Sequence, residues 1–406
     1  MNDMEAGNGR CGKPAGSATE VFTAFLKLGA SSFGGPIAHL GYFHDEFVTR
    51  RRWLGEKEFA DLVALAQFLP GPASSQVGFA LGLFRAGAAG AAAAWTAFTL
   101  PSAILLMLFA YGASGLAGPA GSGILHGLKI VAVAIVAQAV WSMAKSLCPD
   151  RERASIALGA VLLAVFVSGS LGQILAILMG GLAGLWLCRA QGEAVSGHLA
   201  FPVSPVAGLM ALFLFFLVLF GSPVLAAATG TQALAVFDAF YRAGALVFGG
   251  GHVVLPLLEA EIVHTGWVPA DSFLAGYGAA QAVPGPLFTF AAYLGAIMEP
   301  GLEGLAWAAL ALVAIFLPGL LLLVAVIPFW DRFRTWPAAQ AAIRGTNAAV
   351  VGILGAALYQ PVWVSAITSP RAFALALACF VFLMVWKCPP WLVVAVSAAG
   401  GVLIGL

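Results

Sequence analysis

The sequence predicts an all-α protein that crosses a membrane many times. Of its 406 residues, 61% are hydrophobic and only 9% are charged, whereas soluble domains usually contain about 25% charged residues. Apolar runs such as 206–228 and 391–406 lack the alternation of apolar and polar residues that a membrane β-barrel requires. Helix-breaking residues also recur inside apolar stretches of both halves, which indicates a duplicated helical protein in a lipid bilayer.

The polar parts of the chain exclude several classes of protein. Residues 1–20 are small and polar, with neither an apolar core nor a cleavage site, so we expect a cytoplasmic tail and no removed signal peptide. The net charge of +1 argues against a nucleic-acid partner. The five cysteines and the histidines are dispersed, so no metal site is expected. Because no nucleotide-binding motif is present, we expect no cofactor and no direct use of ATP.

Thirteen hydrophobic stretches follow the tail, and each is expected to be helical. They lie at 21–43, 59–84, 88–112, 122–145, 154–168, 170–188, 205–228, 236–258, 273–297, 304–330, 339–358, 371–386 and 389–406. The polar segment 189–204 predicts a seam, with a first repeat at 21–188, a linker at 189–235 and a second repeat at 236–406. The stretch at 205–228 has no counterpart and would be a connector helix. One such crossing inverts the second repeat relative to the first.

Two motifs recur in both halves, and each places glycine or proline inside an apolar stretch. The Phe-Gly-Gly sequence at 33–35 returns 215 residues later at 248–250, and the Pro-Gly-Pro sequence at 70–72 returns at 284–286. Proline breaks or kinks a helix, and glycine weakens it. Matched helix breaks in a duplicated membrane chain indicate the binding site of a transporter.

The distribution of lysine and arginine distinguishes two topologies. If all thirteen stretches span the membrane, the cations at 50–52 and Lys57 face outward, which fits the positive-inside rule poorly. If the two motif-bearing stretches of each half are re-entrant hairpins, fourteen cations lie on the cytoplasmic side and only Arg371 lies outside. We therefore expect about nine full spans and four hairpins, with thirteen spans as the alternative. The breaks would meet near the membrane midplane, lining a path or buried in protein.

The breaks are suited to binding an anion. The second part of a broken helix begins with free backbone N–H groups and the positive end of the helix dipole. Ser32 and Ser74 add hydroxyl donors near these ends, and His252 follows a glycine run. The alternative is that the glycines allow close helix packing, that the prolines kink ordinary spans, and that His252 is a packing residue.

Charged residues in or beside the apolar stretches are further candidates. Lys27 and Arg242 occupy equivalent positions before the Phe-Gly-Gly breaks, and Arg344 lies near the start of its helix. A cation in a membrane stretch is usually functional, so we predict that these supply counter-charge, unless their side chains reach the membrane surface. Glu46 and Glu261 are also equivalent. Desolvation would raise the pKa of such carboxylates, which makes them candidates for proton coupling unless they are solvated loop charges.

These motifs resemble those of a known family. A Phe-Gly-Gly-Pro break at 33–36 and a Gln-x-x-Pro-Gly-Pro break at 67–72, with counterparts in the second half, are similar to the chromate ion transporter family, specifically its long-chain, two-domain members. The resemblance implies a multi-pass transporter of the cell inner membrane that exports chromate and confers chromate resistance. The predicted substrate site comprises Lys27, Ser32, Phe33, Gly34, Gly35, Pro36, Gln67, Pro70, Gly71, Pro72, Ser74, Arg242, Phe248, Gly249, Gly250, His252, Gln281, Pro284, Gly285, Pro286 and Arg344.

The predicted function is chromate export by alternating access through one oxyanion site. Pro36 corresponds to Gly251, so this site is expected to be asymmetric. Sulfate is a structural analogue of chromate, and uptake of sulfate or a related oxyanion is an alternative. An enzyme acting on lipid would need a cluster of carboxylates, histidines or metal ligands, so we expect no catalytic residues. A homodimer is compatible with the sequence.

Overall fold

The computed structural model describes residues 16–113, 118–167, 169–188, 201–299 and 301–404. Within these ranges the chain forms helices and no strand, which confirms the predicted all-α class. Most of the predicted N-terminal tail and residues 189–200 of the predicted linker lie outside them. Six helical segments are long and apolar enough to cross a membrane, so the protein is a multi-pass membrane protein. They are Ala73–Ala113, Pro119–Leu147, Ser170–Leu187, Pro205–Thr229, Glu303–Phe333 and Pro337–Ala366.

The first half begins with two broken helical hairpins. Its helices are α1 (Ala18–Ser31), α2 (Gly35–Phe43), α3 (Glu56–Phe68), α4 (Ala73–Ala113), α5 (Pro119–Leu147), α6 (Arg151–Phe166) and α7 (Ser170–Leu187), with a π-helical segment η1 (His44–Arg50) after α2. The chain reverses between α1 and α2. This reversal brings together the rings of Phe25 and Phe43, which lie on either side of the break with centroids 5.4 Å apart. Within α4 the backbone leaves helical geometry at Ala86 and Gly87, which separates the second hairpin from the following span.

The second half repeats this order after the connector α8 (Pro205–Thr229). It contains α9 (Gln232–Ala245), η2 (Gly251–Val253), α10 (Val254–Leu258), η3 (Glu259–Val263), α11 (Ala270–Ala280), η4 (Leu287–Thr289), α12 (Phe290–Met298) and α13 (Glu303–Val326). Then follow η5 (Ile327–Phe329), α14 (Trp330–Phe333), α15 (Pro337–Ala357), η6 (Leu358–Trp363), α16 (Val364–Ala366), α17 (Pro370–Met384) and α18 (Pro390–Leu403). The chain again reverses at the break between α11 and α12. As a result, the Tyr293 hydroxyl of α12 donates to the Ser272 carbonyl of α11 at 2.9 Å.

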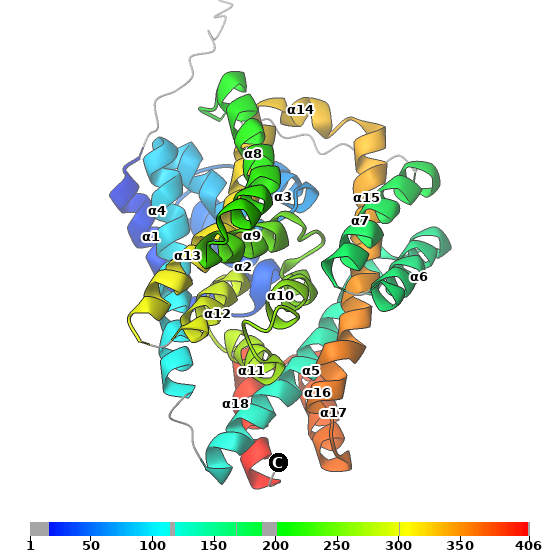
Figure 1. Cartoon of the computed structure of the whole chain (residues 1–406). Coiled ribbons are helices and arrows are strands. Elements are labelled where there is room, and N and C mark those ends of the chain that lie inside the picture. Colours follow the sequence, from blue (N-terminus) through cyan, green and yellow to red (C-terminus); the bar gives the residue numbers. More distant parts are fainter. Residues whose placement is uncertain (1–15, 114–117, 168, 189–200, 300, 405–406) are drawn as a thin grey trace, which may run out of the picture.

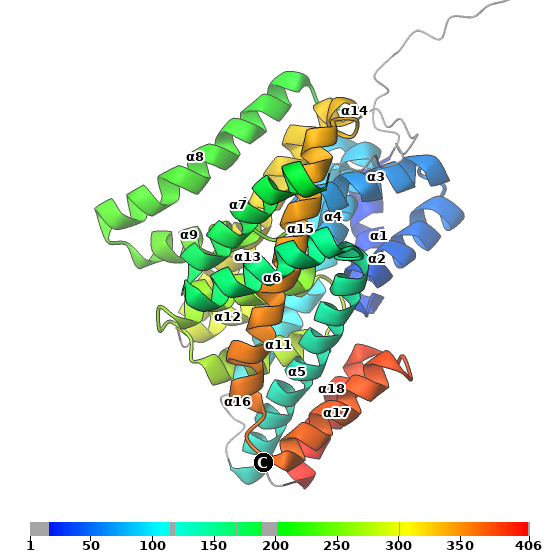
Figure 2. The same cartoon turned by 90° about the vertical axis from the view of Figure 1, so that its right-hand side faces the viewer.

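Each half packs one long helix against the other half. Helix α5 lies beside α17 and α18, and its counterpart α15 lies beside α6 and α7 (Figures 1 and 2). Gly401 of α18 lies against the Gly123 carbonyl of α5, whereas Gly184 of α7 lies against the Ala341 carbonyl of α15. Such reciprocal contacts are those of an approximate twofold relation. In Figure 1, α5 runs upward and α15 runs downward, as inverted repeats require.

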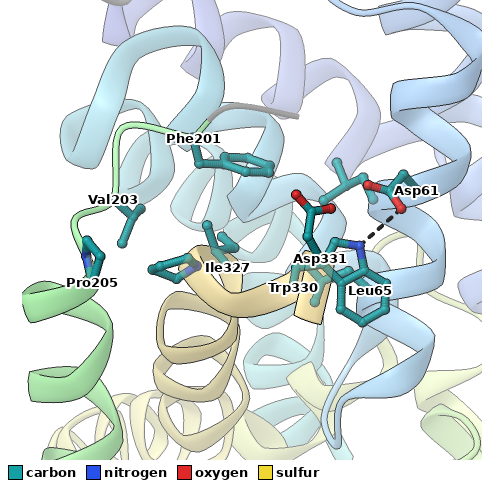
Figure 3. A pocket seen from close by; sticks show the side chains of 10 residues that line it. Asp61, Leu65, Phe201, Val203, Pro205, Ile327, Trp330 and Asp331 are labelled. Carbon is teal, nitrogen blue, oxygen red and sulfur yellow. Dashed lines mark hydrogen bonds between the residues drawn. The ribbon is translucent and has the colours of Figure 1, made fainter. Parts of the chain in front are cut away.

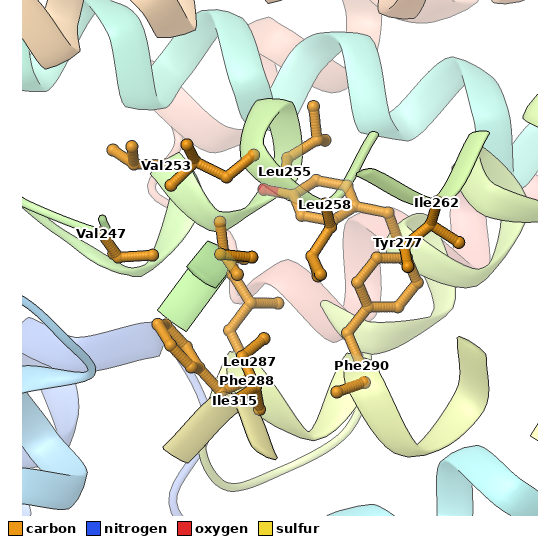
Figure 4. Packing of buried hydrophobic residues seen from close by; sticks show 14 of the residues in the cluster. Val247, Val253, Leu255, Leu258, Ile262, Tyr277, Leu287, Phe288, Phe290 and Ile315 are labelled. Atoms are coloured by element: carbon orange, nitrogen blue, oxygen red, sulfur yellow. The ribbon is translucent and has the colours of Figure 1, made fainter. Parts of the chain in front are cut away.

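The hairpins of the second half form the centre of the hydrophobic core. Side chains from both hairpins, among them Val253, Tyr277 and Phe290, pack with Ile315 of α13 (Figure 4). By contrast, α8 lies at the edge of the molecule in Figure 2 and exposes large apolar side chains such as Phe213 and Phe220. An exposed apolar helix of this kind suits contact with lipid. The broken helices of the second half are thus buried, and the connector is peripheral.

Candidate substrate site

The structure confirms a helix break at each of the four predicted places. Helix α1 ends before Gly34 and α3 ends before Gly71, while α9 ends before Gly249 and α11 ends before Gly285. The φ angles of these glycines are +105°, +117°, +74° and +93°. Residues with a Cβ rarely adopt such angles, so glycine is required where the chain turns.

The breaks of the two halves are joined by a reciprocal pair of backbone hydrogen bonds. The Gly71 N–H donates to the Val247 carbonyl at 2.7 Å, and the Gly285 N–H donates to the Ser32 carbonyl at 2.8 Å. Gly71 and Gly285 are counterparts in the two halves, as are Ser32 and Val247. Each Pro-Gly-Pro break therefore binds the Phe-Gly-Gly break of the other half.

A cavity of about 280 Å³ lies where three of the breaks meet α5. One water occupies about 30 Å³ in the liquid, so the cavity has room for a small polyatomic anion. The described lining residues include no lysine, arginine, aspartate or glutamate. They are Gly34, Gly35, Pro36, Ile37, Ile135, Gln138, Ala139, Ser142, Met143, Gly249, Gly250, Gly251, His252, Ala280, Gln281, Val283, Gly285, Leu287 and Pro390.

The polar groups on the cavity wall are suited to an anion. Helix α2 begins on this wall at Gly35, and its first N–H groups lack acceptors within the helix. Gln281 places a buried side-chain NH₂ group there that has no hydrogen-bond partner among the described residues. A buried donor left unpaired costs about 1–3 kcal/mol, which a bound acceptor would remove. His252 adds a ring whose Nδ1 lies 2.9 Å from the Tyr277 hydroxyl, which leaves Nε2 for another contact.

The three predicted cations do not line this cavity in the structure. Lys27 is exposed on α1. Arg242 lies 2.9 Å from the carboxylate of Asp238 and 2.8 Å from that of Glu261. Arg344 donates to the Cys188 carbonyl at 2.9 Å. Direct binding of substrate by these cations therefore stays a prediction.

Some of the predicted break residues are also separated from the cavity. The Pro-Gly-Pro break at 70–72 packs against Gly319 of α13, where the Gln76 side chain donates to the carbonyls of Pro70 and Gly319. Ser74 lies 3.3 Å from Nδ1 of His39 in the core. Gln67 is exposed, unlike its counterpart Gln281. The site is thus asymmetric in its geometry.

The two predicted proton-coupling acids are both held by arginine. Arg50 and Arg51 each donate to the Glu46 carboxylate, with Nε to oxygen distances of 2.6 Å. The Arg50 hydrogen bonds, followed by those of Arg51, hold the pKa of Glu46 below its usual range despite its burial. The Glu261 carboxylate accepts a hydrogen bond from Arg242. Their roles in proton coupling stay predictions.

Helix α5 contributes to the cavity, and this contribution was not predicted from the sequence. Gln138 and Ser142 of this helix line the cavity. They are four residues apart, which places them on one helix face. Two polar residues at this spacing in an apolar span were the only signal that could have identified them.

Ion pairs at two places connect the described residues of the two halves beyond the central cavity. At one, Trp330 and Arg334 both donate to Oδ1 of Asp61 at 3.0 Å. This contact lies beside a cavity of about 260 Å³ that is lined by α3, η5, α14 and the segment that enters α8 (Figure 3). At the other, Nζ of Lys129 on α5 lies 2.9 Å from Oδ1 of Asp271 on α11. Each pair joins a residue of the first half to a residue of the second.

Helix breaks around a small cavity with polar groups on its wall, in a duplicated membrane fold, are typical of secondary transporters. The family model of chromate transporters matches residues 19–185 and 234–402, and the chain belongs to this family. The match over both halves confirms a long-chain, two-domain member.

Three relatives match most of the chain. The chromate transport protein of Pseudomonas aeruginosa is 28% identical, with 95% of this chain and 92% of the relative covered. That of Cupriavidus metallidurans is 28% identical, with 97% and 94% covered. A probable chromate transport protein of Synechococcus elongatus is 26% identical, with 85% and 84% covered. No solved structure matches the chain significantly.

Proposed function

We propose that this protein is a transporter that exports chromate across the inner membrane, and that the cavity between the breaks is its binding site. The observation that carries the proposal is the reciprocal joining of the breaks, Gly71 to Val247 and Gly285 to Ser32. The names of the relatives support chromate as substrate and a transporter in place of an enzyme. The repeats would correspond to residues 21–188 and 236–406.

Neutral donors are sufficient to hold a tetrahedral dianion in such a site. Hydrogen bonds from N–H groups to an ionised oxygen are about twice as strong as those between neutral groups. Gln138 and Ser142 are available on the α5 wall and Gln281 on the wall after α11, and the N-terminus of α2 adds backbone donors. Because most of these donors are fixed by helices, little reorganisation is needed when the anion binds.

The twofold relation between the halves supports a mechanism of alternating access. If the halves are inverted across the membrane, rocking one against the other exposes the cavity first to one side and then to the other. Export of an anion is favoured by an inside-negative potential, by about 2.3 kcal/mol per charge for each 100 mV. A dianion gains twice this energy, so the potential supports the outward direction.

Uptake of chromate into inverted membrane vesicles tests this function. We expect potential-driven accumulation that sulfate reduces by competition, because the two anions have the same shape and charge. Gln281→Ala should lower uptake at least tenfold, since it removes an orphan donor from the cavity wall. Gln232→Ala, which removes an exposed glutamine of α9, is the matched control and should leave uptake within twofold. Absence of chromate uptake by the wild-type protein under an imposed potential would contradict the proposal.

A further inference from the structure

Glu259 is a buried acid outside the predicted site. It begins η3, after the apolar stretch at 236–258, and its side chain is only 12% exposed. It lines a separate cavity of about 470 Å³, whose other walls come from α6, α7, α15 and η6. Its ion-pair partner among the described residues is His264, with 3.2 Å between Oε1 and Nε2.

None of the described arginines or lysines near Glu259 forms an ion pair with it. On its own element, Glu261 is engaged by Arg242 of α9, which also binds Asp238. The described residues of α6 and α7 that line the cavity are uncharged, and η6 adds the phenol of Tyr359. On α11, Asp271 is paired with Lys129 and Tyr277 contacts His252. In the described part of the chain, no arginine or lysine therefore pairs with the Glu259 carboxylate.

An unpaired acceptor lies in the same cavity. Gln173 of α7 is 8% exposed, and its Nε2 donates to the Pro256 carbonyl at 2.9 Å. Its Oε1 is buried and accepts no hydrogen bond from the described residues. Such an acceptor is costly unless a donor is supplied. The O–H of a protonated carboxyl group, or a water that carries the proton, is a donor of the required kind.

We propose that Glu259, together with His264, is a proton-binding site that couples a proton gradient to transport through the central cavity. The inference rests on the proposed function. Binding adds one proton from water to the carboxylate, which becomes a neutral carboxyl group, and no other reactant is needed. Burial raises the pKa of Glu259 above its ordinary value, although the His264 charge opposes this effect, so the site gains its proton at a higher pH than an exposed glutamate would.

The position of Glu259 provides a route from protonation to the substrate. His252, on the wall of the central cavity, lies seven residues before Glu259 on the same helical arm, which consists of η2, α10 and η3. Seven residues correspond to about 10 Å of helix. Neutralising Glu259 therefore changes the charge of the arm that forms this wall. The counterpart in the first half, His44, is paired with the exposed Glu56 at 2.7 Å. Among the described residues, the proposed site at Glu259 therefore has no equivalent acid at the matching position of the first half.

Reconstituted vesicles with an imposed pH gradient and no membrane potential test the inference. Net chromate transport by the wild-type protein should rise at least fivefold with the gradient. Glu259→Gln should abolish this rise but keep chromate-for-chromate exchange within twofold of wild type. Glu259→Asp, which restores an acid, should recover the gradient dependence. His264→Gln should move the midpoint of the pH profile upward, because a positive imidazole disfavours protonation of Glu259.

A matched control separates the two proposals. Glu303→Gln removes an exposed acid at the start of α13 and should leave the gradient response unchanged. If Glu259→Gln responds to the gradient as wild type does, or if wild-type transport ignores the gradient, Glu259 is not the coupling site. Absence of any chromate exchange by wild-type protein would instead overturn the proposed function.

Discussion

Gly285 shows how a single residue controls the candidate site. Its φ of +93° turns the chain between α11 and η4, and its N–H donates to Ser32 in the other half. An added Cβ would lie 2.8 Å from the Ser102 hydroxyl and 3.2 Å from the Phe98 carbonyl of α4. The same glycine therefore allows the turn and the close approach of the halves.

Gly285→Ala should reduce transport at least tenfold and destabilise the protein by about 1–3 kcal/mol. The physical reasons are the strained backbone angle and the clash with α4. Chromate uptake and thermal unfolding in detergent measure both effects. Gly221→Ala is the matched control, since it lies within α8 with nothing within 4 Å of the added Cβ. Equal behaviour of the two variants would contradict a special role for Gly285.

Residue chemistry also explains which parts of the site the sequence could predict. The breaks were predictable because glycine and proline act on the local backbone. The environment of Arg242 was not predictable. Its partner Asp238 corresponds to Thr23 in the first half, so this acid is not part of the repeated pattern. Equivalence between Lys27 and Arg242 suggested one shared role, whereas the structure exposes one and pairs the other with acids.

At the scale of elements, short helices are held by contacts made far away in the sequence. Helix α3 contacts α14 through Asp61, which accepts hydrogen bonds from Trp330 and Arg334. Asp61 is 2% exposed, so these donors supply the hydrogen bonds that water cannot reach to make. Helix α11 has a comparable link to α5 through Asp271 and Lys129. These ion pairs join elements that must move if the halves rock.

Asp61→Asn should lower the free energy of unfolding by roughly 3 kcal/mol, because it removes one partner of a buried ion pair. Thermal or denaturant unfolding of the purified protein measures this change. Glu56→Gln is the control: it disrupts the exposed pair with His44, in which Glu56 is 72% exposed, and should cost less than about 1 kcal/mol. A loss at Asp61 as small as the loss at Glu56 would show that the α3–α14 contact is not maintained by this pair.

Element predictions from the sequence succeeded where the pattern was local. The apolar stretches and their breaks correspond to observed helices, including the separation of 59–84 from 88–112 at the kink in α4. The sequence did not indicate that α5 would line the cavity, because this role results from its packing with α18 and α11 of the other half. The spacing of Gln138 and Ser142 indicates a polar face on α5, but this spacing does not show which elements that face contacts.

At the scale of the whole molecule, the two halves are related by two sets of reciprocal contacts. The long helix of each half packs against helices of the other half, and the breaks of the two halves are joined by hydrogen bonds. The pairs Gly401 with Gly123 and Gly184 with Ala341 define the first relation, and the hydrogen bonds of Gly71 and Gly285 define the second. Opposite directions of α5 and α15 fit the inverted topology that the charge distribution predicts (Figure 1). The orientation of each half in the membrane stays a prediction.

Cysteine labelling in a cysteine-free background tests this orientation. Lys57→Cys should react only with reagents that reach the cytoplasm, and Asp271→Cys should react from outside, because the hairpins of the two halves open to opposite sides. Both positions are exposed. Labelling of both from the same side of the membrane would contradict inverted repeats.

The central claim is that chromate binds in the cavity where the breaks meet. The most direct test is the chromate-induced rise in unfolding temperature of the purified protein, since a ligand that binds only the folded state stabilises it. We predict a concentration-dependent rise for the wild type and for Gln232→Ala. The double variant Gln138→Ala/Gln281→Ala, which removes two donors from the cavity, should lose that rise. An equal rise in all three proteins would contradict the account.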